Sequence, residues 1–292
     1  MAGLQADILR MIRSFLSHGK RLVLHPQQEI KRFWFELYHR RRPPHDVICY
    51  GKDYSLKLRS DSVLAESLFI GGAFEENEIR FFRDVVKPGM TVFDVGANVG
   101  LYSVISGNAV GQSGRVWSFE PFPPIAMYLR ENVCLNDLIN VTVVEKAVSD
   151  LMGTFDFHVF PEGCDVYNSL GAKERPEEKL HAVEKILVEV TTIDAFAGEA
   201  GIEKIDILKI DVEGAEERVL KGAEQLIRRS PNVQIVIEIY EPSAQQCGCS
   251  SQRLIEMLEG WGFSMFEIGP GCVPICCSAE DFSGVYALFK RE

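Results

Sequence analysis

The chain has 292 residues, a formal net charge of −11 and eight cysteines. This length is enough to bury a substantial core, and it favours one domain with extensions. No unbroken apolar run is long enough to span a bilayer, and the polar, charge-punctuated start does not resemble a cleavable signal peptide. We therefore expect a cytoplasmic protein whose cysteines stay reduced.

The charges are unevenly distributed along the chain. Residues 1–45 contain nine Lys and Arg against three Asp and Glu, so they carry a net charge of +6 and leave −17 for the rest. The acidic remainder argues against a nucleic-acid substrate, because phosphate-binding surfaces need clustered Lys and Arg. The same acidity suits a neutral or cationic acceptor.

Residues 4–16 and 28–40 each place apolar side chains at helical spacing, which predicts two N-terminal helices. These helices either pack on the domain or on a partner subunit, or they form a basic amphipathic element at an anionic membrane surface. Residues 40–44, RRRPP, indicate a linker. We therefore expect a helical extension over residues 1–45 and a second domain over residues 46–292.

The sequence of the second domain predicts strands and helices in alternation. In chain order, we expect a hairpin at 47–59, a helix at 75–86, a strand at 91–95, a helix from 101, a strand at 115–120, a helix at 125–136, a strand at 141–144, an insert at 151–192, a helix at 194–200, a strand at 205–210, a helix at 215–228, a strand at 233–239, a helix at 251–260, and a hairpin of 263–268 with 285–290. This order fits an α/β protein with an open, doubly wound, mostly parallel sheet and one antiparallel strand at its end.

The segment from residue 90 to 100, MTVFDVGANVG, is the most informative part of the chain. Its β-branched and aromatic run predicts a buried strand that breaks into a glycine turn. Gly96 and Gly100 lack Cβ atoms where a ligand would approach the backbone closely. A helix that begins near Leu101 directs its amide-rich N-terminus into the same gap. This geometry suits a nucleotide-like ligand.

The residues of this turn, Asp94-x-Gly96-x-Asn98-x-Gly100, discriminate between nucleotide cofactors. The dinucleotide fingerprint G-x-G-x-x-G is absent. A carboxylate two residues before the first glycine suits a ligand with a cationic amine. The methionine ammonium of S-adenosylmethionine is such a group, whereas nicotinamide dinucleotides bring a pyrophosphate to this turn.

Glu120 ends the next central strand, twenty residues past Gly100. A carboxylate at the tip of the second strand of a βαβ unit accepts hydrogen bonds from ribose hydroxyls. The alternative is an ordinary solvated glutamate at a strand end. Pro121 follows and ends the strand. We count both residues among the cofactor contacts.

Six segments carry a family resemblance when they are taken together. They are VFDVGANVGLYSV, FEPFP, ENVCLND, NVTVVEKAVSD, IDILKIDVEGAEERVLKGAEQLI and VIEIYEP. In this combination the chain resembles the FkbM family of S-adenosylmethionine-dependent methyltransferases, over roughly residues 75–242. The resemblance implies a class I methyltransferase fold, which is Rossmann-like with seven strands, and O-methylation of a small or glycan-like acceptor.

Acidic residues gather at the carboxyl ends of the fourth and fifth central strands, where ligands bind in such sheets. A hydroxyl acceptor needs a base or a metal at its proton. We predict that Asp211 with Glu238 acts as that base, or that both are ligands of Mg²⁺ or Mn²⁺. Asp211 is also expected near the cofactor, and the alternative is that it caps the next helix. Lys209 shares the strand face of Asp211 and is either catalytic or a structural ion-pair partner.

The insert is expected to hold two strands that flank a mobile loop at 161–182. We predict that this loop gates the acceptor pocket, the alternative being a surface excursion without a role. Asn168 and Ser169 resemble the small polar pair of the family and are expected to contact the acceptor or the cofactor carboxylate. Glu213 is expected to bind substrate or to serve only the helix dipole.

The resemblance also places Ala147 and Val148 opposite the adenine ring. Many related enzymes carry an acidic side chain near this position, so here backbone groups would have to accept from the adenine amine. A histidine base would have to be His158 or His181, and each is more simply explained as a surface residue.

The cysteines near the end of the chain suggest one further hypothesis. Two loops predicted at the same sheet edge could bring four thiolates together on zinc, although the spacing matches no common zinc module. The alternative is ordinary reduced cysteines. The residues concerned are Cys247, Cys249, Cys272, Cys276 and Cys277.

Three functions are compatible with these features. The first is an S-adenosylmethionine-dependent O-methyltransferase that acts on a sugar, a glycan or a natural-product-like small molecule. The second is a non-catalytic S-adenosylmethionine-binding partner protein, because binding and turnover share the same residues. The third is a nicotinamide-dependent oxidoreductase, which the missing G-x-G-x-x-G and the lack of a Tyr-x-x-x-Lys pair near strand four disfavour.

Overall fold

A computed structural model describes residues 27, 30–32, 34–35, 44–71, 74–175, 179–268, 274–279, 282 and 284–291. The helix predicted at 4–16, most of the one at 28–40, and Cys272 lie outside these residues, so the proposed membrane or subunit contact of residues 1–45 stays a prediction. Among the described residues, no helix combines the length and the apolar character that a membrane crossing requires.

The chain divides into two compact units, Met1–Cys49 with Lys57–Phe74 and Tyr50–Leu56 with Glu75–Glu292. The predicted hairpin is present as β1 (Asp46–Tyr50) and β2 (Ser55–Arg59). The smaller unit also contains α4 (Val63–Gly71), a short helix that we did not predict. This division assigns residues 57–74 to the smaller unit, whereas the sequence suggested a single boundary near residue 46.

The larger unit is built on one sheet with the strand order β14-β13-β15-β12-β11-β3-β4-β5. Five neighbouring strands from β12 to β5 are parallel, and β15 is antiparallel to both β12 and β13. This arrangement confirms the doubly wound, seven-stranded fold, to which β14 adds a short unpredicted edge strand. The bounds are β3 (Thr91–Val95), β4 (Arg115–Phe119), β5 (Val141–Val144), β11 (Ile207–Ile210), β12 (Gln234–Glu238), β13 (Ser264–Ile268), β14 (Pro274–Cys276) and β15 (Tyr286–Lys290).

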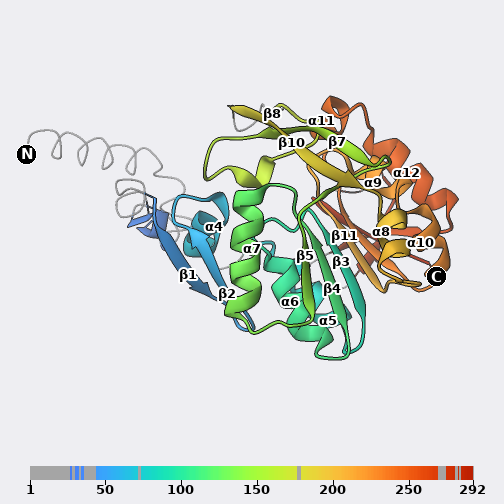
Figure 1. Ribbon diagram of the computed structural model, residues 1–292, viewed down its shortest axis with the longest axis horizontal. Coiled ribbons are helices and arrows are strands. Elements are labelled where there is room, and N and C mark those ends of the chain that lie inside the picture. Colours follow the sequence, from blue (N-terminus) through green and yellow to red (C-terminus); the bar gives the residue numbers. More distant parts are fainter. Residues whose placement is uncertain are drawn as a thin grey trace, which may run out of the picture. The chain divides into compact units, whose positions relative to one another are not determined.

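Helices cover both faces of this sheet (Figure 1). On one face lie α5 (Glu76–Val85), α6 (Leu101–Val110) and α7 (Pro123–Leu135). On the other lie α8 (Ile193–Glu199), α9 (Glu216–Lys221), α10 (Glu224–Arg229) and α12 (Ser251–Gly260). Side chains of β3 alternate between the faces, because Phe93 and Val95 join the apolar core with α8 and α9 while Asp94 meets Ser103 of α6.

The single helix predicted at 215–228 is interrupted between α9 and α10. The chain passes close to another segment at Gly222, where a Cβ atom would lie 2.1 Å from the backbone oxygen of Ser149. The backbone oxygen of Gly222 also accepts a hydrogen bond from the Asp194 amide at 2.8 Å. After β12, an unpredicted short helix, α11 (Glu241–Gln246), begins with Pro242 in its first turn, where proline is tolerated.

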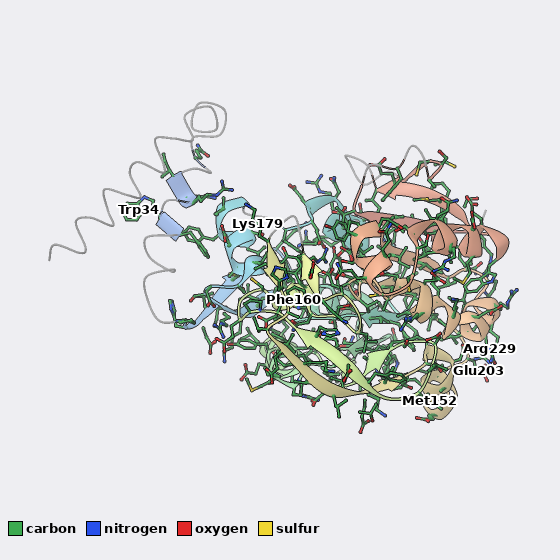
Figure 2. The ribbon with its side chains drawn as sticks, turned by 90° about the horizontal axis from the view of Figure 1, so that it is seen from above. Trp34, Met152, Phe160, Lys179, Glu203 and Arg229 are labelled. Carbon is green, nitrogen blue, oxygen red and sulfur yellow. The ribbon has the colours of Figure 1, made fainter. Side chains whose placement is uncertain are left out.

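The insert forms a small sheet of its own, in the order β6-β10-β7. Strands β7 (Gly153–Val159) and β10 (Glu184–Thr191) are the two flanking strands that we predicted, and β6 (Ala147–Val148) completes the sheet. The loop between them contains η1 (Asp165–Tyr167), β8 (Glu174–Arg175) and β9 (Leu180–His181). Figure 2 shows Phe160 within the chain and Met152 at the surface, in agreement with their exposed fractions of 1% and 63%. The mobility of this loop stays a prediction.

Candidate active site

The glycine turn after β3 is shaped by contacts within the chain itself. Gly96 and Gly100 have φ angles of +76° and +95°, in the left-handed region that favours glycine. A Cβ atom on Gly96 would lie 1.7 Å from the backbone oxygen of Asp211, and one on Gly100 would lie 2.4 Å from Leu129 Cδ1. We predicted that a ligand requires this space. The chain itself already requires glycine here, because the end of β11 and the Leu129 side chain in the middle of α7 fill this space, and the approach of a ligand stays a prediction.

Glu120 lies beside this turn, as the sequence predicted. Its Oε2 accepts a hydrogen bond from the Asn98 amide at 3.0 Å, and its Oε1 accepts one from the Phe122 amide at 2.9 Å. Burial raises the pKa of Glu120 to about 7, although both amides favour the charged form. Asn98 itself has a φ of +48°, and Pro121 stands between Glu120 and Phe122 in the sequence. Each carboxylate oxygen retains acceptor capacity for a further hydroxyl.

Asp94 lies behind the turn, with a side chain only 1% exposed. Its Oδ2 accepts a hydrogen bond from Ser103 Oγ at 2.6 Å, and its Oδ1 lies 3.5 Å from Lys209 Nζ. The lysine and the aspartate are direct partners in the register of β11 and β3. A cation of the chain therefore lies beside Asp94, and the contact with the ammonium of a cofactor that we predicted for Asp94 stays a prediction.

Lys209 joins the turn to the end of β11. Its Nζ donates to the backbone oxygen of Gly96 at 3.1 Å and to Asp211 Oδ2 at 3.0 Å. Burial opposes the charge on this lysine, but the carboxylates of Asp211 and Asp94 outweigh burial and raise the pKa of Lys209 above its ordinary value. This geometry matches the ion-pair alternative that we gave for Lys209.

Asp211 follows the last residue of β11, and its Oδ2 also accepts a hydrogen bond from the Tyr286 hydroxyl at 2.7 Å. The alternative that Asp211 caps the next helix is wrong. Helix α9 begins later, at Glu216, whose Oε1 accepts from the amides of Val212 and Gly214 at 3.0 Å each. Glu216 therefore satisfies the amides that precede this helix.

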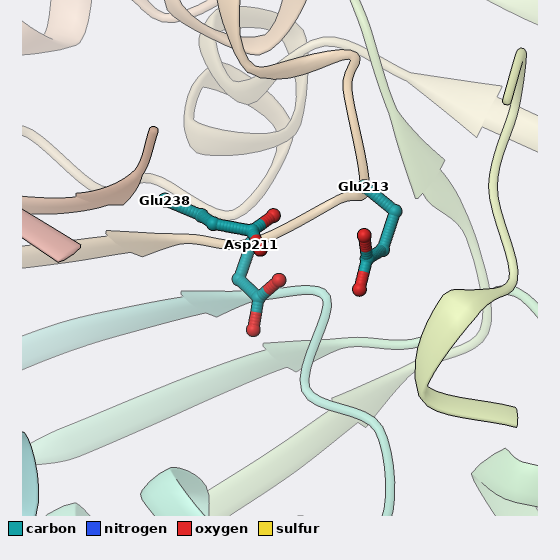
Figure 3. Close-up of side chains that lie close together, drawn as sticks. All are labelled: Asp211, Glu213 and Glu238. Carbon is teal, nitrogen blue, oxygen red and sulfur yellow. The ribbon is translucent and has the colours of Figure 1, made fainter. Parts of the chain in front are cut away.

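Three carboxylates from Asp211, Glu213 and Glu238 converge beyond the ends of β11 and β12 (Figure 3), with one oxygen of each within 4.8 Å of the others. Burial raises the pKa of Glu238 well above its ordinary value, and the negative charges of Asp211 and Glu216 raise it further. Glu238 Oε2 is buried and has no hydrogen-bond partner among the described residues. Oxygen-rich groups of this kind suit a proton or a divalent cation.

Glu213 pairs with Arg175, a residue of the insert that the sequence did not single out. Arg175 is 4% exposed, and its guanidinium forms an ion pair with the Glu213 carboxylate. The guanidinium also lies over the rings of Tyr167 and Tyr240, 4.8 Å and 4.6 Å from their centroids. Glu213 precedes α9 and has a φ of +59°, so it is not in the first turn of that helix. The insert is thereby fastened to the turn after β11.

Asn168 and Ser169 lie in different environments. Ser169 Oγ donates to the backbone oxygen of Glu213 at 2.8 Å and accepts from the amides of Gly171 and Ala172 at 3.2 Å each. A hydroxyl has one donor and two lone pairs, so these three bonds occupy Ser169 Oγ within the chain. The substrate contact that we gave Ser169 stays a prediction. Asn168 Oδ1 accepts from the Phe160 amide at 2.8 Å, but its Nδ2 is buried without a hydrogen-bond partner within the described part of the chain.

Four further predicted positions lie in the small sheet of the insert and in its loop. Ala147 and Val148 are buried in β6, where they pair with β10, and their contact with adenine stays a prediction. His158 lies opposite Lys185 on the small sheet, and burial followed by nearby lysines lowers its pKa. His181 is largely exposed and lies 3.7 Å from Glu174.

The described cysteines do not support the zinc hypothesis. Cys247 and Cys249 are buried in a small apolar cluster with Ala172 and Ala244. Burial raises the pKa of Cys247 to about 11 and also raises that of Cys249, and the group of possible metal-ligand atoms that lies together among the described residues consists of Asp211, Glu213 and Glu238 instead. Cys276 is exposed.

Glu75 and Tyr102 also belong to this site and were not predicted. The Tyr102 hydroxyl donates to Glu75 Oε2, and the Tyr102 ring lies 5.1 Å from Lys209 Nζ. Glu75 has a φ of +46°, and burial together with the charge of Asp211 raises its pKa to about 7. A single glutamate before a helix gives no indication in the sequence of such a contact.

The sequence of this chain is similar to those of known proteins. The family model described as the methyltransferase FkbM domain matches residues 94–265. The chain is 31% identical to methyltransferase sdnD of Sordaria araneosa, over 60% of this chain and 73% of that protein. It is 29% identical to the 2-O-methyltransferase NoeI of Sinorhizobium fredii, over 53% of this chain and 67% of that protein. It is 28% identical to the 31-O-demethyl-FK506 methyltransferase FkbM of Streptomyces tacrolimicus, over 62% of this chain and 75% of that protein.

Proposed function

The chain belongs to the FkbM methyltransferase family, and from this premise we propose that it methylates a hydroxyl oxygen of a sugar, a glycan or a natural-product-like small molecule. It is an S-adenosylmethionine-dependent methyltransferase. The relatives NoeI and FkbM are named for methylation at oxygen, which supports a hydroxyl as the acceptor group here. Family membership argues against the nicotinamide-dependent oxidoreductase that the sequence features alone left open.

The groups around the glycine turn fit S-adenosylmethionine. We assign Glu120 to the ribose hydroxyls, because both of its oxygens are fixed by backbone amides and still have acceptor capacity. The turn from Gly96 to Gly100 would carry the methionine part of the cofactor. The buried Asn168 Nδ2, which has no hydrogen-bond partner among the described residues, is a suitable donor for its carboxylate. Asp94 and Lys209 support the turn from behind.

The chemistry that S-adenosylmethionine supplies when bound is an activated, electrophilic methyl group. The residues of the chain must hold the acceptor oxygen in line and receive its proton. We assign this task to Asp211, whose side chain is 22% exposed and therefore accessible to an acceptor. Glu238 is its partner, since it is more deeply buried and its raised pKa makes it a stronger base than an ordinary glutamate.

A more specific form of this proposal is that the same carboxylates bind a divalent cation, Mg²⁺ or Mn²⁺. Both ions prefer oxygen ligands, and Asp211 and Glu238 would supply them. The buried Glu238 Oε2 without a hydrogen-bond partner in the described chain is the atom that a cation would satisfy. Glu213 would be the weaker ligand, because Arg175 already neutralises it. When bound, such a cation stabilises a deprotonated acceptor oxygen.

The observation that carries the proposal is the position of Asp211 against the glycine turn. Lys209 Nζ donates both to the backbone oxygen of Gly96 at 3.1 Å and to Asp211 Oδ2 at 3.0 Å. The carboxylate at the end of β11 therefore lies beside the turn assigned to the cofactor. A base and a methyl donor must be neighbours in this way for transfer to a hydroxyl.

The proposal is tested with methyl-labelled S-adenosylmethionine and a soluble extract of glycans and small molecules as the source of acceptors. We expect the wild-type chain to transfer label to an extract component, detected by mass spectrometry. Asp211→Asn should bind S-adenosylhomocysteine nearly as well as the wild type but transfer far more slowly. Asp156→Asn is the matched control, since Asp156 is an exposed partner of Lys185 in the insert.

Two outcomes would change the proposal. Tight binding of S-adenosylhomocysteine without transfer to any component would favour the non-catalytic binding protein instead. Transfer that is lost with a chelator and restored by Mg²⁺ or Mn²⁺ would support the cation, whereas transfer unaffected by a chelator would leave Asp211 and Glu238 as proton acceptors only.

A further inference from the structure

A row of polar residues runs across three strands at the carboxyl end of the sheet. Asp211 follows Ile210, whose partner on β12 is Ile237, so Asp211 lies level with Glu238. Tyr286, the first residue of β15, is the direct partner of Glu238. Residues that lie opposite each other on neighbouring strands point to the same face of a sheet. The antiparallel strand β15 therefore brings the Tyr286 hydroxyl to the carboxylate of Asp211.

Two donors meet on one oxygen of Asp211. The Tyr286 hydroxyl donates to Oδ2 at 2.7 Å, and Lys209 Nζ donates to the same oxygen at 3.0 Å. Both bonds are charge-assisted, and together they fix the plane of the carboxylate. Oδ1 is then the oxygen directed away from both donors, on a side chain that is 22% exposed.

The two donors do not constrain the carboxylate equally. Lys209 Nζ is shared with the backbone oxygen of Gly96 and with Asp94, and it sits at the end of a long side chain. Tyr286 is a rigid ring buried at 5% exposure. The direction of the Asp211 carboxylate is therefore set mainly from β15.

We infer that Tyr286 is a positioning residue, whose hydroxyl holds Asp211 so that Oδ1 faces the hydroxyl of the acceptor. This inference rests on the proposed function, because it gives Tyr286 its role through Asp211. Tyr286 lies beyond residues 94–265, which the family model matches. Through Tyr286, the last strand of the sheet therefore contributes to the site, although β15 contributes no residue of the glycine turn.

The test compares Tyr286→Phe with Ser230→Ala. Both changes remove only a buried hydroxyl, and Ser230 is a control outside the site, because its hydroxyl donates to the backbone oxygen of Leu226 at 2.7 Å and accepts from the Ile205 amide that precedes β11. S-adenosylhomocysteine affinity is measured by calorimetry. The initial rate of methyl transfer is measured with labelled S-adenosylmethionine and the soluble extract at fixed concentration. We expect Tyr286→Phe to bind S-adenosylhomocysteine like the wild type and to transfer about ten- to a hundredfold more slowly, as expected for a lost hydrogen bond to a charged group.

A double variant separates positioning from a general structural effect. If Tyr286 acts through Asp211, then Tyr286→Phe should cost little further rate in an Asp211→Asn background. Three results would each overturn the inference. They are an equal loss of rate in both backgrounds, a wild-type rate for Tyr286→Phe, and a loss of S-adenosylhomocysteine affinity that matches the loss of rate. A slow rate for Ser230→Ala equal to that of Tyr286→Phe would do the same. Absence of label transfer by the wild-type chain would overturn the proposed function itself, which is a different result from these.

Discussion

Replacing Lys209 by methionine tests the buried charges that join the glycine turn to β11. Methionine keeps much of the length of the side chain and removes its charge. Lys209 is 3% exposed and lies 3.5 Å from Asp94 Oδ1 and 3.0 Å from Asp211 Oδ2. Without it, Asp94 remains at 1% exposure with Ser103 as its hydrogen-bond donor and no cation beside it.

The expected cost follows from this geometry. Removing one partner of a buried ion pair typically costs about 3–5 kcal/mol, because the other charge stays buried without compensation. For a domain of this size, about 1 kcal/mol lowers the midpoint of thermal unfolding by roughly 2–4 °C, so we expect a decrease of roughly 6–20 °C. Lys221→Met is the control, since Lys221 pairs with Glu217 at 2.7 Å but is 50% exposed. An exposed pair of this kind contributes about 0–1 kcal/mol.

The assays are thermal and denaturant unfolding of both variants and of Asp94→Asn with Lys209→Met combined. The double variant should recover part of the loss, because the carboxylate that needed Lys209 is gone. Recovery should be incomplete, since Asp211 also faces the lysine. If Lys209→Met unfolds within about 1 kcal/mol of the wild type, the buried ion pairs do not contribute as argued.

Three further predictions concern single side chains. Glu120→Gln should weaken S-adenosylhomocysteine binding by roughly 1–3 kcal/mol in calorimetry, since it replaces the carboxylate that accepts from the ribose hydroxyls. Unchanged affinity would remove Glu120 from the cofactor site. Ser169→Ala should lower the free energy of unfolding by about 1–3 kcal/mol without changing that affinity, because its three hydrogen bonds are internal; weakened cofactor binding at unchanged stability would contradict this. The pKa of Glu75 is raised from 4.5 to about 7 on folding, so the folded chain holds a proton that the unfolded chain has lost, and stability should fall as pH rises from about 4.5 to 7. Glu75→Gln should flatten that slope in unfolding experiments, and an unchanged slope would show that Glu75 is not responsible.

Most of the central sheet was predictable because local patterns specify it. The run at 91–95 with its glycine turn, and the strand that ends at Glu120, both have the expected structure. Short elements that depend on long-range packing were missed. One example is β14, which pairs with β13 at the sheet edge, and another is the interruption at Gly222, where the chain passes a distant backbone oxygen.

The site was predictable only in part, for the same reason. The sequence indicates which residues end the strands, so Asp211, Glu238 and Glu120 were identified. It does not indicate the register between strands, which brings Lys209 beside Asp94 and Tyr286 beside Glu238. Arg175 was missed because its partner Glu213 lies far along the chain, and nothing local distinguishes it from an exposed arginine in a charged loop.

The central claim is that this chain transfers a methyl group to a hydroxyl oxygen. The most direct measurement is the carbon-13 NMR spectrum of the product formed with S-adenosylmethionine labelled at its methyl group. We predict that the wild-type chain yields an O-methyl signal with one equivalent of S-adenosylhomocysteine, and that Asp211→Asn forms the same product at a much lower rate. An N-methyl or S-methyl signal, or full turnover by Asp211→Asn, would contradict it.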